Sequence, residues 1–396
     1  TFHSIAAQIL RRHAELVGLK SNYTILDTDD QERLIKQLLE AENIDAKRWT
    51  PKTLAGLIDH WKNRGWTPEK LPPAEGAHFA NNKGQRLYSL YQERLRVLNA
   101  CDFGDLLLHN LTIFLGHPDV LADYHERFKY VLVDEYQDTN ATQYEVLKHL
   151  VGERGRFTAV GDDDQSIYGW RGAEVTHILG FARDWPDAAV VRLEDNYRSR
   201  APILQLANTL IAHNSTRHDK VLRPSREGGE TPRFLRFEEE TAEAESVVRE
   251  IRRRIDSESE DRISPSDIAI LFRTNEQPRA FELELRRERV PYVLVGGLSF
   301  YDRKEIRDVL AYLKVLANPN DEVSLLRVFN TPARGIGGGT VETLLRQAVE
   351  AGVPLWAVLP GARDNGDIAH HAGERVEAFR QMIEGWRAQL GQRPLS

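Results

Sequence analysis

Several residue types that mark particular classes of protein are scarce in this 396-residue chain. The single cysteine, Cys101, excludes an internal disulfide framework and a cysteine-rich zinc site. No apolar run reaches the length of about eighteen residues that crosses a membrane, and no signal-like segment opens the sequence. We therefore expect neither a membrane span nor secretion, and a reducing cytoplasm fits the composition.

An excess of basic charge is also missing. The formal net charge is −7, which gives no support to a protein that coats nucleic acid over its whole surface. A nucleic acid would have to bind along a local basic and aromatic track. Hydrophobic residues at 41% and charged residues at 29% are typical of a globular protein, and the length allows several domains.

The loop that most often surrounds nucleotide phosphates is absent as well. No Gly-x-x-x-x-Gly-Lys-Ser/Thr sequence occurs in the chain. The nearest string, Gly18-Leu19-Lys20-Ser21, lacks the upstream glycine and follows a helical pattern rather than a strand.

The most informative segment present is a short apolar strand, predicted over Tyr130–Asp134, that ends in two adjacent carboxylates. Such a strand delivers its last side chains to the carboxyl edge of a parallel sheet, where α/β proteins bind ligands. In nucleotide hydrolases the first acid holds Mg²⁺ and the next orients or deprotonates the attacking water. Asp134 and Glu135 fit these two tasks, whereas an acidic turn without chemistry is the simpler alternative.

A second segment follows the next predicted strand, Phe157–Gly161. Gln165 has an amide that can both donate and accept hydrogen bonds, which suits the sensing of a γ-phosphate; a solvated loop glutamine is the alternative. Tyr168, Trp170 and Arg171 form an aromatic and basic group of the kind on which bases stack. Ordinary core packing of the rings, or a salt bridge of Arg171, would also explain them.

The order of predicted elements indicates an α/β protein with inserted helical regions. Helical patterns dominate from Ile5 to about His117, with turn breaks at Thr50-Pro51 and Pro72-Pro73. Strands and helices then alternate, which predicts parallel sheets with right-handed crossovers. The predicted strands are 130–134, 157–161, 189–193, 233–237, 268–273 and 292–296, and the predicted helices among them are 141–151, 202–213, 240–255 and 276–289. From about residue 298 the pattern is helical again.

Taken together, these motifs resemble those of the UvrD/Rep/PcrA group of superfamily 1 DNA helicases. The resemblance covers nearly the whole chain in the family's order, through residues 1–4, 131–139, 160–172, 191–199, 296–300 and 331–337. It implies two RecA-like parallel-sheet domains of the P-loop NTPase type with inserted helical subdomains. The first RecA-like domain would take residues 1–21 and 118–193 around a helical insertion at 22–117, an incomplete second domain 194–297, and the start of a second insertion 298–396.

The same resemblance implies a role for each site residue. Asp134 is expected at Mg²⁺, Glu135 as the catalytic base and Gln165 as the γ-phosphate sensor. Arg198 is expected as an arginine finger and Tyr197 against the adenine ring. A helix-start arginine paired with Glu194 or Asp195 is the alternative for Arg198.

Further DNA contacts are implied at both ends of the chain. Thr1, Phe2 and His3 match a motif that contacts single-stranded DNA. Gly335 and Gly337 match a Gly-Ile-Gly element that touches duplex DNA, although a plain glycine-rich turn explains them equally well.

The resemblance implies an ATP-driven helicase that moves 3′ to 5′ on DNA in repair or replication restart, with ATP in the cleft between the RecA-like domains. The implied cofactors are ATP and Mg²⁺, and the implied partners are single-stranded DNA, single-strand/duplex junctions and repair proteins, in the cytoplasm at the nucleoid. Because the phosphate loop is missing, we expect this chain to be the middle of a longer helicase and to hydrolyse ATP poorly by itself. A non-catalytic single-strand-binding module and the helicase part of a helicase–nuclease are the alternatives.

Overall fold

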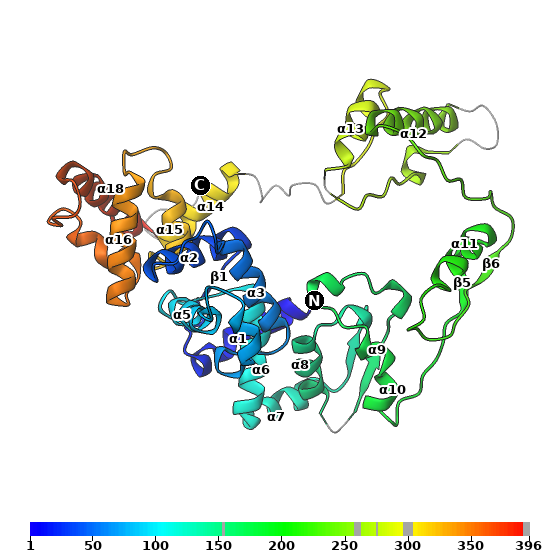
Figure 1. Ribbon diagram of the computed structural model, residues 1–396, viewed down its shortest axis with the longest axis horizontal. Helices are drawn as coiled ribbons and strands as arrows, with labels where there is room; N and C mark the ends of the chain where they lie inside the picture. Colours follow the sequence, from blue (N-terminus) through cyan, green and yellow to red (C-terminus); the bar gives the residue numbers. More distant parts are fainter. Residues whose placement is uncertain (153–154, 257–262, 275, 296–303, 391–396) are drawn as a thin grey trace. The chain divides into compact units, whose positions relative to one another are not determined.

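The structure is a computed structural model that describes residues 1–152, 155–256, 263–274, 276–295 and 304–390. The chain divides into two compact units, which Figure 1 colours by sequence. The first unit comprises Thr1–Val191, Ser215–Asp219 and Asp308–Ser396, and the second comprises Arg192–Asn214 and Lys220–Arg307. Each unit buries an apolar core of its own.

The first unit opens with amphipathic helices whose ends are set by local capping. They are α1 (Phe2–His13), α2 (Thr28–Ala41), α3 (Pro51–Asn63), α4 (Pro73–Ala77), α5 (Gly84–Val97), α6 (Phe103–Gly116) and α7 (Pro118–Arg127). Asp27 and Asp102 each accept a backbone N–H three residues later in capping boxes that start α2 and α6. Thr50 and Pro51 start α3, so the predicted breaks are confirmed.

The core of this helical region contains several aromatic residues. Trp61 is fully buried, and Trp49 and Trp66 pack against the same cluster. The short parallel strands β1 (Thr24–Ile25) and β2 (Ala100–Cys101) pair beside it. The remaining members are mainly leucines and tyrosines at helical spacing: Leu34, Ile35, Leu38, Leu39, Leu54, Ile58, Leu87, Tyr88, Tyr91 and Leu95.

A buried charge cluster lies in the same region. The Lys62 Nζ atom is 2.7 Å from both Asp102 Oδ2 and Asp105 Oδ1, and all three side chains are at most 5% exposed. Tyr91 donates a hydrogen bond to Asp102 Oδ2 at 2.9 Å. A Cβ atom on Gly104 would lie 2.9 Å from Lys62 Cδ, so glycine leaves room for the lysine stem.

The strand that ends in the acidic pair forms a parallel ladder with the next strand. β3 (Val131–Val133) pairs with β4 (Phe157–Ala159), with Val131 opposite Phe157. Asn140 caps α8 (Ala141–Val151) in a capping box, so this helix has its predicted bounds. The short helices α9 (Thr176–Leu179) and α10 (Phe181–Asp184) follow. The strand predicted over 189–193 is wrong: residues 189–193 form no strand, and Val191 and Leu193 are exposed.

The last part of the first unit is a second helical region. It contains α14 (Lys304–Ala317), which starts in the other unit, and α15 (Glu322–Phe329), α16 (Gly338–Ala351), α17 (Leu355–Val358) and α18 (His370–Gln389). Its core is made by fully buried side chains that include Val315, Leu325, Val328, Leu344, Leu355, Leu359 and Val376. The helical pattern predicted from about residue 298 is thus confirmed for the described residues from Lys304 onward.

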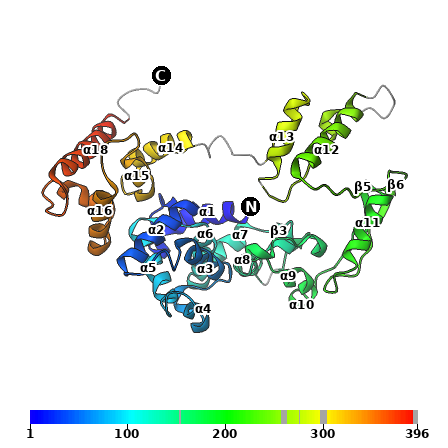
Figure 2. The ribbon, with the colours of Figure 1, turned by 45° about the horizontal axis from the view of Figure 1, so that its top comes forward.

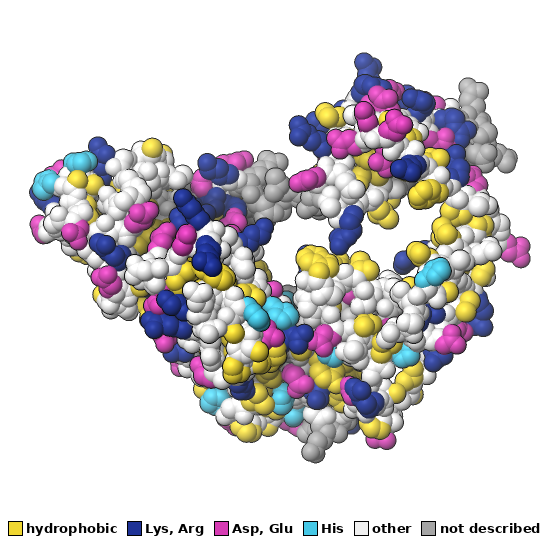
Figure 3. All heavy atoms as spheres, viewed as in Figure 1, with side chains coloured by type: hydrophobic (Ala, Val, Ile, Leu, Met, Phe, Trp, Pro, Cys, Tyr) yellow, Lys and Arg dark blue, Asp and Glu magenta, His cyan; other side chains and the backbone are white. Residues whose placement is uncertain are grey.

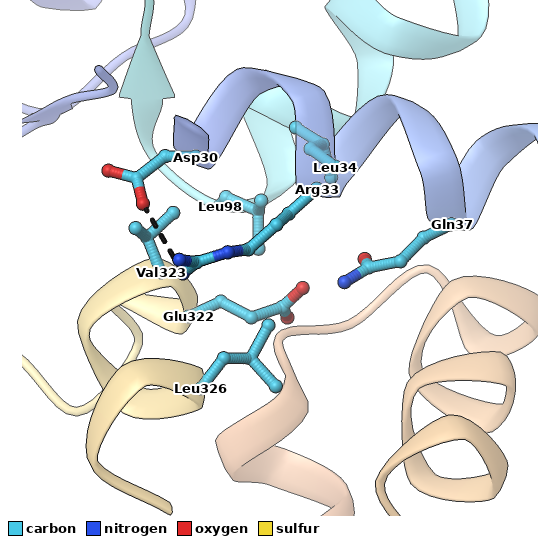
Figure 4. Close-up of a pocket in the computed structure, with 8 residues that line it drawn as sticks. All are labelled: Asp30, Arg33, Leu34, Gln37, Leu98, Glu322, Val323 and Leu326. Carbon is cyan, nitrogen blue, oxygen red and sulfur yellow. Dashed lines mark ion pairs between the residues drawn. The ribbon is translucent and has the colours of Figure 1, made fainter. Parts of the chain in front are cut away.

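A buried ion pair joins the two helical regions of the first unit, where α2 lies beside α15 in both ribbon views (Figures 1 and 2). Arg94 on α5 donates to both carboxylate oxygens of Glu322 on α15 at 2.8 Å, and both side chains are at most 4% exposed. Figure 4 shows a small crevice beside this pair, lined by residues of α2, α15 and the end of α5. None of the predicted site residues lies in it.

The second unit contains less regular structure than predicted. β5 (Asp195–Arg200) and β6 (Arg223–Arg226) pair in parallel, with α11 (Ala201–Ile211) between them in sequence. α12 (Glu240–Ile255) and α13 (Pro278–Arg287) pack through Val248, Ile251 and Leu285. The predicted helices are therefore confirmed, and the parallel pairing agrees with the predicted α/β class.

The strands predicted at 233–237, 268–273 and 292–296 are wrong for the residues that the structure describes there. Phe234, Leu271 and Val293 are at least 87% exposed and lie against no sheet. An alternating apolar pattern becomes a strand only when a neighbouring strand and a covering layer are in place. Residue 296 lies outside the described residues, as does the motif at 296–300.

No helix among the described residues is long and apolar enough to cross a membrane.

Candidate functional site

The two acidic residues follow β3 at the edge where β4 also ends. Asp134 and Glu135 are both exposed, and the Glu135 N–H donates to Asp134 Oδ1 at 2.9 Å. Glu135 has a φ of +52°, a conformation that costs a non-glycine residue roughly 1–3 kcal/mol and is concentrated at functional sites. Exposed carboxylate oxygens side by side are the ligands that Mg²⁺ takes together with phosphates, so the residues present fit that ion.

The loop after β4 carries Gln165 beside this edge. Its Nε2 donates to Asp162 Oδ2 at 2.8 Å, and the side chain is exposed. Arg217 donates two hydrogen bonds to Asp164 at 2.7 Å each, and the His218 N–H donates to Asp163 at 2.8 Å. The short 3₁₀ turn that presents Gln165 is therefore tied down by ionic and backbone contacts.

The three neighbouring aspartates also form a group of potential metal ligands. Within the part of the chain that the structure describes, Asp162, Asp163 and Asp164 alone bring three or more ligand atoms within 4.8 Å of one another. Arg217 already neutralises part of their charge. The group is thus explained as the anchor of the Gln165 turn.

The aromatic and basic group forms an exposed platform. Trp170 is 64% and Tyr168 38% exposed, with ring centroids 6.4 Å apart. The Arg171 guanidinium lies over both rings, 4.6 Å from the Trp170 centroid and 5.4 Å from that of Tyr168. Among the described residues Arg171 contacts the two rings and makes no ion pair, so the salt-bridge alternative has no support. The exposure of both rings also argues against the other alternative, in which Tyr168 and Trp170 are ordinary core residues.

The platform is hydrogen-bonded to the loop that follows the acidic pair. Glu174 N–H donates to the Thr139 carbonyl at 3.0 Å, and Asn140 and Ala173 form an antiparallel bridge. Gly172, at a φ of +83°, closes the platform's turn, and a Cβ there would lie 3.3 Å from Asn63 Cβ. The acidic edge and the stacking platform are thus parts of one connected loop system.

Thr1, Phe2 and His3 lie at the start of α1. The Thr1 hydroxyl caps the helix by accepting the Ser4 N–H at 3.3 Å, and Phe2 packs partly into two core clusters. Burial lowers the pKa of His3, and the nearby Asp59 carboxylate partly opposes this. These residues therefore have structural contacts in addition to their predicted role.

The structure adds one aromatic residue that the sequence did not single out. Phe103 is 54% exposed and makes an edge contact with the His3 ring, with centroids 6.1 Å apart. Asn63 Nδ2 donates a hydrogen bond at 3.0 Å to Asp59, the carboxylate near His3, and Asn63 Oδ1 accepts one at 2.9 Å from Asn140. The last turn of α3 thus connects the start of α1 with the platform. A local signal for Phe103 existed, because it follows the Asp102 cap as the first helical residue.

Tyr197 and Arg198 lie on β5 in the second unit. Tyr197 is 75% exposed, and the structure describes no side-chain partner of the Arg198 guanidinium. Glu194 and Asp195 are contacted by Arg223 instead, at 3.7 and 3.0 Å. The alternative pairing of Arg198 with these acids is therefore not found.

Gly335 and Gly337 lie ahead of α16 in the second helical region. Gly335 has a φ of +72° and its carbonyl accepts a hydrogen bond from Arg375 at 2.9 Å. Arg375 packs against the position that a Cβ would occupy. Gly337 caps α16, and a Cβ there would meet open space. A turn explains Gly335, whereas Gly337 leaves the helix start accessible to a phosphate.

Charge is not segregated on the visible face. Figure 3 shows Lys and Arg side chains interspersed with Asp and Glu side chains over this face rather than gathered in one basic patch. This matches the acidic net charge and leaves local contacts as the means of binding a polyanion.

Two family models together match most of the chain. The UvrD/REP helicase N-terminal domain matches residues 1–186, and the UvrD-like helicase C-terminal domain matches residues 191–363. The chain is therefore of the α/β class with RecA-like domains that such helicases share. It belongs to the UvrD/REP helicase family.

Curated relatives agree with this assignment. A probable DNA helicase II homolog of Rickettsia felis is 39% identical over 98% of the chain and 59% of its own length. ATP-dependent DNA helicase PcrA of Staphylococcus epidermidis is 43% identical over 97% of the chain and 52% of its own length. The PcrA of Staphylococcus aureus is 41% identical over the same share. The chain spans about half the length of the curated relatives it matches.

Proposed function

We propose that this chain supplies the acidic and DNA-stacking parts of an ATP-dependent DNA helicase. The observation that carries the proposal is the connected loop system in which Glu135, Gln165 and Trp170 share one edge of the first unit. A motor needs this connection, because a change at the nucleotide must alter the grip on DNA. Family membership and the names of the relatives support the same conclusion.

In this proposal each side chain has a defined task. Asp134 holds Mg²⁺, which neutralises phosphate charge when bound, and Glu135 orients or deprotonates the attacking water. Gln165 hydrogen-bonds the γ-phosphate side of the site. Arg198 and Tyr197 are exposed on their own unit and are available for the transferred phosphate and the adenine ring.

In the same proposal, the platform of Tyr168, Trp170 and Arg171 binds single-stranded DNA. Successive bases stack on Trp170 and Tyr168, while Arg171, held over the rings, contributes a cation for the backbone. Thr1, Phe2 and His3, with Phe103, extend this surface, and Gly337 offers a helix start to duplex phosphates. The family resemblance alone supports four further parts of the proposal: movement in the 3′-to-5′ direction, action at single-strand/duplex junctions, repair partners and a place at the nucleoid.

The test is ATP hydrolysis by the protein encoded by the complete gene, with and without single-stranded oligonucleotide. Hydrolysis stimulated by the oligonucleotide supports the motor. Oligonucleotide binding without hydrolysis would instead favour a non-catalytic binding module.

A further inference from the structure

Gln137 is a buried residue next to the acidic pair that has no task in the proposed function. Its side chain is 1% exposed, although glutamine is usually a surface residue. Both ends of its amide are engaged: Nε2 donates to Glu135 Oε2 at 2.8 Å, and Oε1 accepts the Asp162 N–H at 2.9 Å. One buried amide therefore holds a carboxylate after β3 and a backbone group after β4.

These contacts continue to the sensor residue. The carboxylate of Asp162 accepts a hydrogen bond from Gln165 Nε2 at 2.8 Å. Glu135 and Gln165 are thus linked through Gln137 and Asp162 by an unbroken series of hydrogen bonds.

The packing around the Gln137 amide leaves it little freedom. A Cβ on Gly161 would lie 2.7 Å from Gln137 Oε1 and 3.0 Å from the Tyr136 nitrogen. The Tyr136 N–H in turn donates to the Val160 carbonyl at 3.0 Å. The loop after β4 can approach the amide this closely only because residue 161 is glycine.

We propose that Gln137 is a positioning residue that couples Glu135 to the Gln165 loop; this inference rests on the proposed function. If Glu135 turns toward a water molecule, Gln137 loses its acceptor, and a buried amide cannot replace that partner with solvent. The amide must then shift, which releases the Asp162 N–H and with it the turn that presents Gln165. Because an amide does not ionise near neutral pH, it transmits orientation and not a proton.

The first variant to test is Gln137→Met, which keeps the length and burial of the side chain but removes both hydrogen bonds. In the protein encoded by the complete gene, we expect kcat for DNA-stimulated ATP hydrolysis to fall by roughly tenfold to a hundredfold, as expected for misplaced catalytic groups. The KM for ATP and DNA affinity without nucleotide should change by less than about threefold, because Gln137 contacts neither ligand in the proposed function. Gln381→Met, at an exposed glutamine of α18, is the matched control and should leave kcat unchanged.

Two further variants separate positioning from folding. Gln137→Glu keeps the shape but loses the donor, so it should not restore turnover even if its melting temperature equals that of the unaltered protein. Gln137→Met and Gln165→Ala should be non-additive in kcat, because both interrupt the same series of contacts. Unchanged kcat in Gln137→Met, normal turnover in Gln137→Glu, or additive losses would each overturn the role of Gln137. Absence of DNA-stimulated hydrolysis in the unaltered protein would overturn the proposed function itself, and the role of Gln137 with it.

Discussion

Lys62 and Asp102 form an ion pair, 2.7 Å between Nζ and Oδ2, in which neither side chain is more than 5% exposed. Burial lowers the pKa of Lys62, but Asp102 and Asp105 raise it by more, so the ammonium stays charged inside the core. The lysine thereby links α3 to the cap of α6.

Lys62→Met should be strongly destabilising, because it leaves two buried carboxylates without their cation. We expect a loss of roughly 3–5 kcal/mol in the free energy of unfolding, the usual cost of breaking a buried pair from one side. Urea denaturation followed by circular dichroism measures it. Combining Lys62→Met with Asp102→Asn and Asp105→Asn should recover part of the loss, and a cost below about 1 kcal/mol for Lys62→Met alone would contradict this role.

The buried Arg94–Glu322 pair should contribute far more to the free energy of unfolding than an exposed ion pair on the same helix. Arg94→Met leaves the Glu322 carboxylate, 2% exposed, with only the Leu355 N–H as a partner and should cost roughly 3–5 kcal/mol. Arg86→Met is the matched control, since Arg86 on α5 pairs with Glu42 at 3.0 Å but is 66% exposed. That control should cost less than about 1 kcal/mol. Equal effects of the two variants in denaturant titrations would show that the buried pair does not hold the helical regions together.

Asp30 should make stability depend on pH. Burial, and then the neighbouring Asp27, raises the pKa of Asp30 from 3.8 to about 6. The folded chain therefore binds a proton that the unfolded chain has released between these values. The resulting stability is fully present below pH 3.8 and is lost as the pH rises through about 6. Asp30→Asn should accordingly stabilise the protein by roughly 1 kcal/mol near neutral pH, and by much less near pH 4, in paired thermal melts. The same gain at both pH values would argue against titration as the cause.

Trp170→Ala should weaken binding of single-stranded DNA without weakening the fold. Loss of one stacking ring corresponds to about 1–3 kcal/mol of binding free energy, measurable by fluorescence anisotropy of a labelled oligonucleotide. Its 64% exposure predicts little change in melting temperature. Trp386→Ala, at a tryptophan of α18 that is 44% exposed, is the control and should bind normally. A fall in melting temperature as large as the fall in affinity would instead assign Trp170 to folding.

Glu135→Gln should abolish ATP hydrolysis in the protein encoded by the complete gene while nucleotide binding persists. The amide keeps the size of the carboxylate but cannot take a proton from water. Steady-state turnover and binding of a fluorescent nucleotide separate the two effects. Retained turnover would remove Glu135 from the role of base.

Helices were the part of the fold most accessible from the sequence. α8 and α12 have the predicted bounds, because the apolar spacing of each is local to the helix and Asn140 caps the start of α8. The strands at 233–237 and 268–273 were mispredicted because strand formation depends on partners elsewhere in the chain.

The candidate site likewise contains residues that the sequence could identify and residues that only the structure revealed. Asp134, Glu135 and Trp170 could be singled out from the sequence, because each lies in a short motif whose residue types and spacing indicate its chemistry. The sequence could place Phe103 at a helix start but not beside His3, and it could not place Gln137 between two loops, because both placements depend on contacts between separate elements.

The sequence by itself determined which residues carry charge, rings and hydrogen-bonding groups, and where helices begin and end, because these properties are local. Only the tertiary structure decided which of those groups meet. Arg94 and Glu322 are 228 positions apart, and Gln137 and Asp162 are 25 apart. Such contacts form only when packed cores bring distant segments together, and burial then makes each hydrogen bond costly to lose.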